Sequence, residues 1–87
     1  MNKLQHYIEE RSSRDPEFKL AYEAEMLVLD LLNARKAKGY SQTDMALRLH
    51  VSQPYLAQIE GISKKINTDL MIRYASELGL SLKFVEL

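Results

Sequence analysis

The spacing of apolar residues divides most of this chain into helical segments. Residues 3–11 place Leu4, Tyr7 and Ile8 on one side of a short amphipathic helix, and a helical period continues as far as Gly79. The pattern changes in residues 81–87, where apolar and polar side chains partly alternate, as is typical of a strand. We therefore predict an all-α fold of five helices, with an extended N-terminal helix and a short C-terminal β-strand.

The second predicted helix is unusually long. Residues 12–14 are expected to break the first helix, and Asp15 and Pro16 then provide an N-cap and a first helical residue. The helix is predicted to run to about Lys38 and to end at Gly39. Its apolar residues form two stripes, one of Phe18, Tyr22, Leu29 and Leu32 and the other of Leu20, Leu27, Leu31 and Ala34. Apolar surface this wide requires either a core on both sides or a partner protein.

Two short helices joined by a tight turn follow. Ser41 is the predicted N-cap of the first, with Asp44 completing a weak capping box, and Ser52 is the predicted N-cap of the second. His50 lies in the turn, where a left-handed backbone is expected, and Gly61 ends the second helix. This pattern predicts a helix-turn-helix, in which the second helix enters the major groove of DNA.

The outer face of that second helix is rich in amides. Gln can form paired hydrogen bonds to adenine, so Gln53 and Gln58 are the best candidates for reading bases. Gln42, at the start of the preceding helix, is expected to contact phosphate. The candidate DNA-binding residues are Gln42, Thr43, Ser52, Gln53, Pro54, Tyr55, Gln58, Lys64, Lys65 and Thr68. The alternative is that these glutamines are only solvated helix surface; their combined spacing favours recognition.

The C-terminal segment predicts a dimer contact. A last helix begins at Asn67–Thr68–Asp69 and ends at Gly79, and the strand that follows would have no partner strand in the same chain. Its backbone groups would therefore pair with another chain. The candidate dimerisation residues are Leu82, Phe84 and Val85.

Charge is distributed unevenly along a chain whose formal net charge is zero. Residues 1–34 hold four basic and seven acidic side chains, whereas residues 35–65 hold six basic and two acidic ones. The positive segment coincides with the helix-turn-helix, and the acidic segment suggests a basic second partner. Within the positive segment, Arg35 and Glu60 are expected to form a partly buried ion pair that orients the second helix; the alternative is two unrelated surface charges.

Length and composition exclude several classes of protein. The chain has 87 residues, which suffice for one small domain, and no cysteine that could form a disulfide or a thiolate metal site. We expect no enzyme, metal or cofactor, because His6 and His50 have no matching nucleophile, carboxylate cluster or phosphate loop beside them. With no signal peptide and no long apolar run, a cytoplasmic protein without membrane contact is expected.

Residues 35–79 resemble the Cro/repressor-type helix-turn-helix domain, also called the XRE family. The resemblance rests on Arg35, Gln42, Ala46 at the helix crossing, the Val51–Ser52–Gln53 turn, and Ile59–Glu60–Gly61 at the end of the second helix. It implies that Gln53 reads a base, that Gln42 binds phosphate, and that Arg35 and Glu60 form a structural pair. His50 stands where the family usually has Gly.

The layout of the whole chain is similar to the HigA-type antitoxins. The likeness rests on an acidic leading helix, the Asp15–Pro16–Glu17–Phe18 start of a long helix, the repressor-type motif and the Leu78–Gly79–Leu80–Ser81–Leu82 tail. It implies a homodimer that represses its own operon and neutralises a RelE-like ribonuclease toxin. The toxin-binding candidates are Tyr7, Ile8, Phe18 and Tyr22.

Three regions and three functions follow as hypotheses. Residues 1–34 would be a helical extension that binds the toxin, residues 35–80 the DNA-binding domain, and residues 81–87 the dimerisation strand. The leading hypothesis is an autorepressing antitoxin. The alternatives are a stand-alone, phage-like transcriptional repressor, and a protein-interaction module that has lost DNA binding, which the zero net charge permits.

Overall fold

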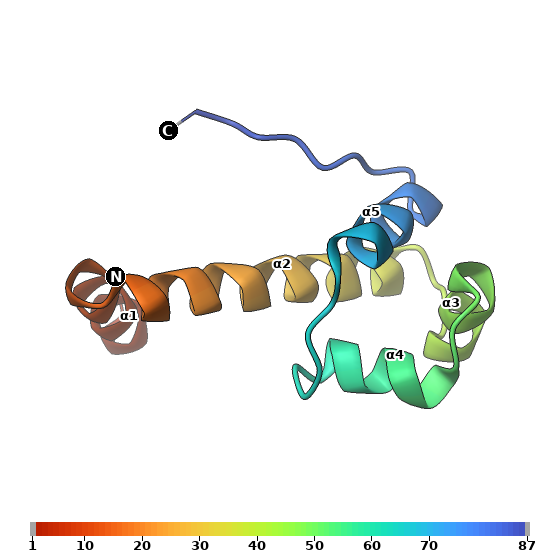
Figure 1. Ribbon diagram of the computed structural model, residues 1–87, viewed down its shortest axis with the longest axis horizontal. Helices are drawn as coiled ribbons and strands as arrows, with labels where there is room; N and C mark the ends of the chain where they lie inside the picture. Colours follow the sequence, from red (N-terminus) through yellow and green to blue (C-terminus); the bar gives the residue numbers. More distant parts are fainter. Residues whose placement is uncertain (1, 87) are drawn as a thin grey trace.

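The computed structural model describes residues 2–86, which form five helices, four of them around one core (Figure 1). The long helix α2 crosses the molecule, with α1 at its N-terminal end and α3, α4 and α5 gathered around its C-terminal half. The bounds are α1 Lys3–Arg14, α2 Pro16–Ala37, α3 Gln42–Leu49, α4 Gln53–Glu60 and α5 Thr68–Glu77. The predicted all-helical architecture is confirmed over these residues.

The first helix is longer than predicted, because residues 12–14 continue it instead of breaking it. Ser13 donates its hydroxyl to the carbonyl of Glu10 at 2.8 Å, so this serine bonds back into the helix. The break falls at Asp15, whose backbone is extended with φ −134°. The proline that follows explains this, since a residue before proline is pushed out of the helical region.

Side-chain caps begin the remaining helices where the sequence predicts them. Asp15 caps α2, and Ser41 and Ser52 accept hydrogen bonds from the backbone amides of Asp44 at 3.0 Å and Tyr55 at 3.2 Å. His50 has φ 57° and ψ 40°, the left-handed conformation expected for this turn. The caps therefore fix where α3 and α4 begin, and His50 marks the end of α3.

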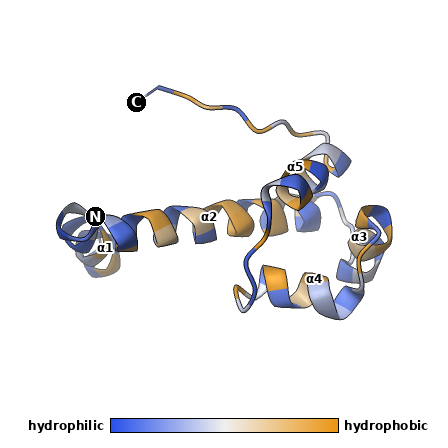
Figure 2. Ribbon diagram, in the orientation of Figure 1, coloured by the Kyte–Doolittle hydropathy of each residue, from blue (hydrophilic) through white to orange (hydrophobic). Residues whose placement is uncertain are grey.

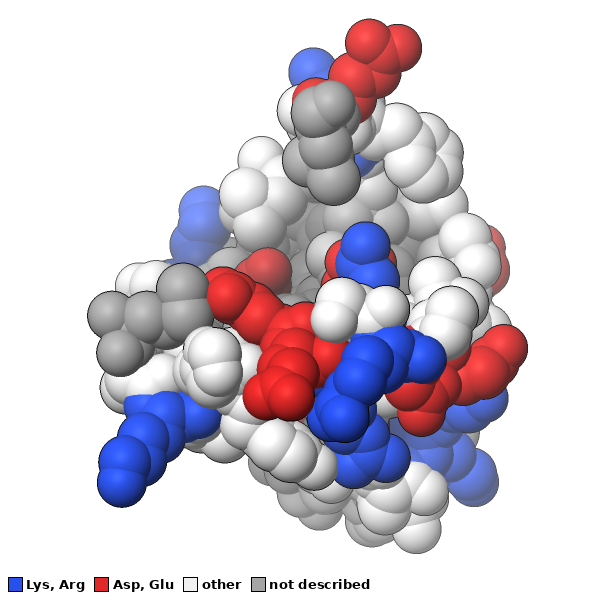
Figure 3. All heavy atoms as spheres, turned by 90° about the vertical axis from the view of Figure 1, so that its left-hand side faces the viewer, with Lys and Arg blue, Asp and Glu red and all other residues white. Residues whose placement is uncertain are grey.

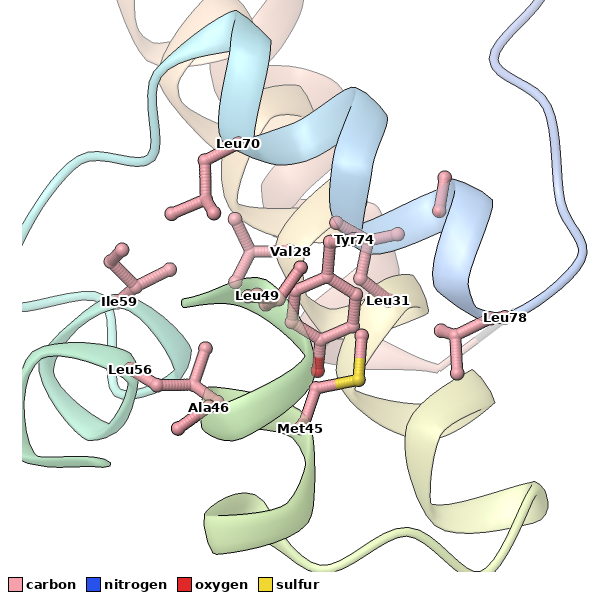
Figure 4. Close-up of a cluster of buried hydrophobic side chains, with 11 residues drawn as sticks. Val28, Leu31, Met45, Ala46, Leu49, Leu56, Ile59, Leu70, Tyr74 and Leu78 are labelled. Atoms are coloured by element: carbon pink, nitrogen blue, oxygen red, sulfur yellow. The ribbon is translucent and has the colours of Figure 1, made fainter. Parts of the chain in front are cut away.

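The core is formed by α3, α4 and α5 packed against the C-terminal half of α2 (Figure 4). Its buried hydrophobic residues are Val28, Leu31, Met45, Ala46, Leu49, Leu56, Ile59, Leu70, Tyr74, Ala75 and Leu78. Val28 belongs to neither predicted stripe of α2, yet it is buried. Met71 and Val51 are half-buried and border the core.

Much of the apolar surface of α2 lies outside this core. Among residues in the predicted stripes, only Leu31 is buried, whereas Leu20 is 61% and Leu27 44% exposed. Apolar segments continue along α2 well beyond the part that α3, α4 and α5 cover (Figure 2). No helix within residues 2–86 is long and apolar enough to cross a membrane.

The predicted C-terminal strand is not confirmed. Residues 81–86 form no strand, and the last backbone hydrogen bond of the described chain runs from Leu80 to the carbonyl of Ala75 at 2.9 Å. A strand exists only when a neighbour pairs with its backbone groups, and the five helices offer none. Leu87, also in the predicted strand, lies outside the described residues.

Candidate nucleic-acid interface

The turn between α3 and α4 holds the two helices in a fixed relation. The backbone amide of Val51 donates to the carbonyl of Ala46 at 3.0 Å, and that of His50 donates to Leu47 at 3.2 Å. Ala46 is only 2% exposed where the helices meet, so a larger side chain would force them apart. Local sequence and core packing together therefore produce the helix-turn-helix geometry.

One face of α4 is exposed. Gln53, Pro54 and Gln58 are exposed, whereas Tyr55 is half-buried and packs against the core. Pro54 is the second helical residue, where its missing N–H leaves no hydrogen bond unmade. Ser52 is also exposed, but its hydroxyl already caps the helix. Gln53 and Gln58 are thus the amides of α4 that remain accessible to DNA bases.

The side chain of Gln53 is positioned by a neighbour on α3. Gln53 donates its Nε2 to Oε1 of Gln42, and Gln42 donates its own Nε2 to Oε1 of Glu60 at 3.1 Å. These two bonds connect the first residues of both helices to the end of α4. The structure therefore brings Gln42 and Gln53, both predicted DNA-binding residues, into direct contact.

The predicted Arg35–Glu60 pair is present and buried. Arg35 donates to Glu60 through its terminal nitrogen at 2.8 Å and through Nε at 3.0 Å, and it also donates to the carbonyl of Tyr40 at 2.8 Å. Burial opposes the charge of the guanidinium, but the hydrogen bond and the charge of Glu60 outweigh it and raise the pKa of Arg35.

A third group completes this cluster and was missed in the sequence. Tyr74 of α5, 1% exposed, donates its hydroxyl to Oε2 of Glu60 at 2.5 Å. Burial, followed by this hydrogen bond to a carboxylate, raises the pKa of Tyr74 well above its ordinary value. A tyrosine at a core position is the available signal, since its hydroxyl needs a partner when buried. Glu60 thus joins α4 to α2, α3 and α5.

The remaining DNA-binding candidates surround this face without joining the network. Thr43 and Thr68 are exposed in the first turns of α3 and α5, and Lys65 is exposed in the loop after α4. The ammonium of Lys64 lies 5.2 Å from the ring centre of Tyr55, which places this cation beside α4. Lys64 and Tyr55 are therefore close together, as a shared contact with the DNA backbone would require.

The positive surplus of residues 35–65 remains on the surface. Arg35 and Glu60 neutralise each other inside, while the other basic side chains, Lys36, Lys38, Arg48, Lys64 and Lys65, are exposed with Asp44 as the only exposed acid. Arg48 approaches Glu77 of α5 at 3.7 Å and stacks over Tyr40 at 4.2 Å. The segment that contains the helix-turn-helix thus carries local positive charge on a neutral chain, and Lys64 brings part of it beside α4.

Within residues 2–86, no group of three or more His, Asp or Glu side chains is arranged to hold a metal ion. The chemistry available at this face is hydrogen bonding by amides and hydroxyls together with charge attraction. These are the interactions by which proteins read bases and hold phosphates.

The capped turn, the exposed amide face of α4 and its basic surroundings define a DNA-binding domain of the helix-turn-helix class. Residues 31–85 match the helix-turn-helix family, and the chain belongs to this family, in its Cro/repressor-type (XRE) form. No curated protein and no solved structure matches the chain. The family makes this chain a DNA-binding transcription regulator.

Proposed function

We propose that this regulator is the antitoxin of a toxin–antitoxin pair, a dimeric repressor of its own operon that also binds a RelE-like ribonuclease toxin. The observation that carries the proposal is the α1–α2 extension. Only the C-terminal half of α2 packs into the core of the DNA-binding domain. Neither α1 nor the apolar N-terminal part of α2 belongs to that core or to the DNA-binding face. Such a surface on a repressor favours a protein partner.

The toxin-binding candidates fall into two groups in the extension. Phe18 stacks on Tyr22 with ring centres 6.3 Å apart, and the guanidinium of Arg11 lies 4.4 Å from the ring centre of Phe18. These aromatics therefore support the junction of α1 with α2. Tyr7 is 50% exposed and Ile8 is half-buried, so α1 contributes the more accessible contacts.

The charge of the extension supports a basic partner. Residues 1–34 hold three more acidic than basic side chains. Acidic and basic groups lie side by side over the end of the molecule formed by α1, so the surplus is spread and not a single acidic face (Figure 3). Electrostatic attraction would therefore steer a basic toxin, while the apolar residues would supply the contact area.

Separate surfaces for DNA and toxin provide the main test. Gln53→Ala removes the leading base reader and is expected to abolish binding to the DNA upstream of the gene in a gel shift, while neutralisation of the toxin continues. Tyr7→Ala is expected to weaken toxin binding and leave the gel shift unchanged. Loss of both activities in either folded variant would contradict separate surfaces.

The partner is tested by co-purification with the product of the adjacent reading frame. Capture of a small basic protein, whose ribonuclease activity the chain suppresses, supports the antitoxin. If no such partner exists and the chain still binds its upstream DNA, the protein is a stand-alone repressor. Failure to retard that DNA at low salt would contradict both repressor functions.

Dimerisation is part of the proposal, because one α4 offers a small base-reading surface. Two copies would bind half-sites about one DNA turn apart and so gain affinity. Leu82, Phe84 and Val85 are 44%, 109% and 78% exposed and form no contact that buries them. Sedimentation of a chain truncated after Gly79 tests the tail: a truncated chain that stays dimeric would contradict this assignment.

A further inference from the structure

An open groove of 410 Å³ lies between α2 and the loop that joins α4 to α5. Leu20, Ala24 and Val28 line it from α2, and Ile62 and Ile66 line it from the loop. From α4 only the buried residue Ile59 lines the groove, so the groove lies away from the exposed amides of that helix. The groove borders the core at Val28 and Ile59, and Lys64 and Lys65 at its edge are also candidates for DNA contact. Its exposed apolar side chains, Leu20 and Ile62, serve neither the core nor DNA recognition.

The two walls of the groove carry opposite charges. Glu17 and Glu25 lie on the α2 side, and Lys64 and Lys65 lie on the loop side. All four side chains belong to exposed residues. An occupant that satisfies this groove must be apolar along its length, with a positive group toward α2 and a negative group toward the loop.

The C-terminal tail has this composition. Residues 82–86 read Leu-Lys-Phe-Val-Glu, with one basic and one acidic residue around two apolar ones. Successive side chains of an extended segment point to opposite sides, so Lys83 and Val85 share one side while Phe84 and Glu86 share the other. With Lys83 toward α2, Glu86 faces Lys64 and Lys65; the reverse orientation would oppose like charges.

The lengths of the groove and the tail also agree. The lining residues of α2 extend from Glu17 to Val28, which is about 16 Å of helix at 1.5 Å per residue. Residues 82–86 span about 16 Å when extended at 3.3 Å per residue. The tail can thus lie along the whole groove in one extended stretch.

The tail of the same chain does not occupy this groove. None of residues 80–86 lines the groove, and in Figure 1 residues 81–86 run above α2, whereas the loop between α4 and α5 crosses α2 and continues below it. The first tail residues, Leu80 and Leu82, border α2 beside Leu27 and Leu31, outside the groove. Met71 of α5 borders both the groove and the hollow that Leu80 and Leu82 line, so the tail lies beside the groove of its own chain and not in it.

We propose that two copies of this chain exchange their C-terminal tails, each tail lying in the α2–loop groove of the other copy. The inference rests on the dimer of the proposed function and names its acceptor site. The exchange is symmetric, so each dimer contains two tail–groove contacts. Lys83 of each tail pairs with the acidic side of the partner groove, and Phe84 packs against its loop side.

Mixing of two defective variants tests the exchange in the full-length chain. Ala24→Trp fills the groove from an exposed helical position, and Phe84→Ser with Val85→Ser disables the tail. Each variant alone has no intact contact and is expected to sediment as a monomer, with dimer affinity reduced at least about tenfold. Their mixture restores one contact and recovers a heterodimer. Ala37→Trp, on α2 outside the groove, is the control and remains dimeric.

Cysteine pairs report the contact directly, because the natural chain has no cysteine. Ala24→Cys and Val85→Cys on separate chains are expected to form a disulfide-linked heterodimer when the two are mixed and oxidised. A disulfide within one chain carrying both substitutions would overturn the exchange in favour of its own tail. Linkage of Val85→Cys chains to each other would overturn it in favour of tail-to-tail pairing.

Failure of this inference can be told apart from failure of the proposed function. If Ala24→Trp stays dimeric but loses toxin binding, the groove receives the toxin and the exchange is wrong, while the dimeric antitoxin stands. If the natural chain is a monomer both free and on DNA, the dimer and the exchange fail together. A charge reversal adds a last check: Lys83→Glu weakens the dimer, and Glu17→Lys with Glu25→Lys restores it.

Discussion

The guanidinium of Arg35 holds the carboxylate of Glu60 through two hydrogen bonds of 2.8 and 3.0 Å, with both side chains less than a tenth exposed. This contact fixes the end of the recognition helix α4 against α2. Tyr74 and Gln42 bond to the same carboxylate, so the orientation of α4 depends on one residue.

Removal of one partner should therefore be costly. Arg35→Met leaves the Glu60 charge buried without its cation, and we expect it to lower the free energy of unfolding by about 3–5 kcal/mol. Urea unfolding followed by circular dichroism measures this. The control is Arg73→Met, which breaks the exposed Asp69–Arg73 pair at 3.2 Å and should cost less than about 1 kcal/mol. Equal losses for both variants would contradict a structural role for the buried pair.

Lys64 and Lys65 should contribute to affinity without contributing to sequence preference. If each contacts a phosphate, Lys64→Gln with Lys65→Gln lowers the slope of log binding constant against log salt by about 0.9 per lost contact. Fluorescence titration of operator and random DNA at several salt concentrations measures the slope. Lys19→Gln, at an exposed position of α2, is the control. An unchanged slope, or weakening confined to the operator, would show that these lysines do not bind phosphate.

His50 adopts an unfavourable left-handed backbone conformation in the turn between α3 and α4. A residue with a Cβ is disfavoured at its φ of 57°, whereas glycine adopts this conformation readily. His50→Gly is expected to stabilise the domain by about 1 kcal/mol, measured as a higher midpoint of thermal unfolding. His50→Ala keeps the Cβ and should show no such gain. A destabilised glycine variant would mean that the exposed imidazole contributes a contact of its own.

The capping box of α3 should make stability depend on acidic pH. Hydrogen bonds from the side chain and backbone of Ser41 lower the pKa of Asp44 below its ordinary 3.8. The cap therefore contributes fully above that value and is lost as the pH falls through the lower folded pKa. Unfolding curves should show that Asp44→Asn costs stability at neutral pH and progressively less toward acid. Asp30→Asn, an exposed residue in mid-α2, is the control, and parallel pH profiles would refute the assignment.

Capping residues and apolar spacing predicted that each helix exists, and they predicted where most helices begin, but they misplaced the end of α1. Asp15, Ser41 and Ser52 act as caps through contacts with nearby residues, so their positions could be read directly. The end of α1 was misplaced because Ser13 can bond either out of a helix or back into it. Which α2 residue becomes buried depends on where α3, α4 and α5 pack, and Val28 was missed for that reason.

The sequence by itself determined the class of this protein: the spacing of caps, turn and apolar residues produces a helix-turn-helix, and Arg35, Gln42 and Gln53 were identified from it. Only the tertiary structure decided that the hydroxyl of Tyr74 joins Glu60, and that the tail lies outside the groove of its own chain. Caps and periodicity act over a few residues and can be read along the chain. Contacts between distant segments depend on how the helices pack, and no local pattern contains that information.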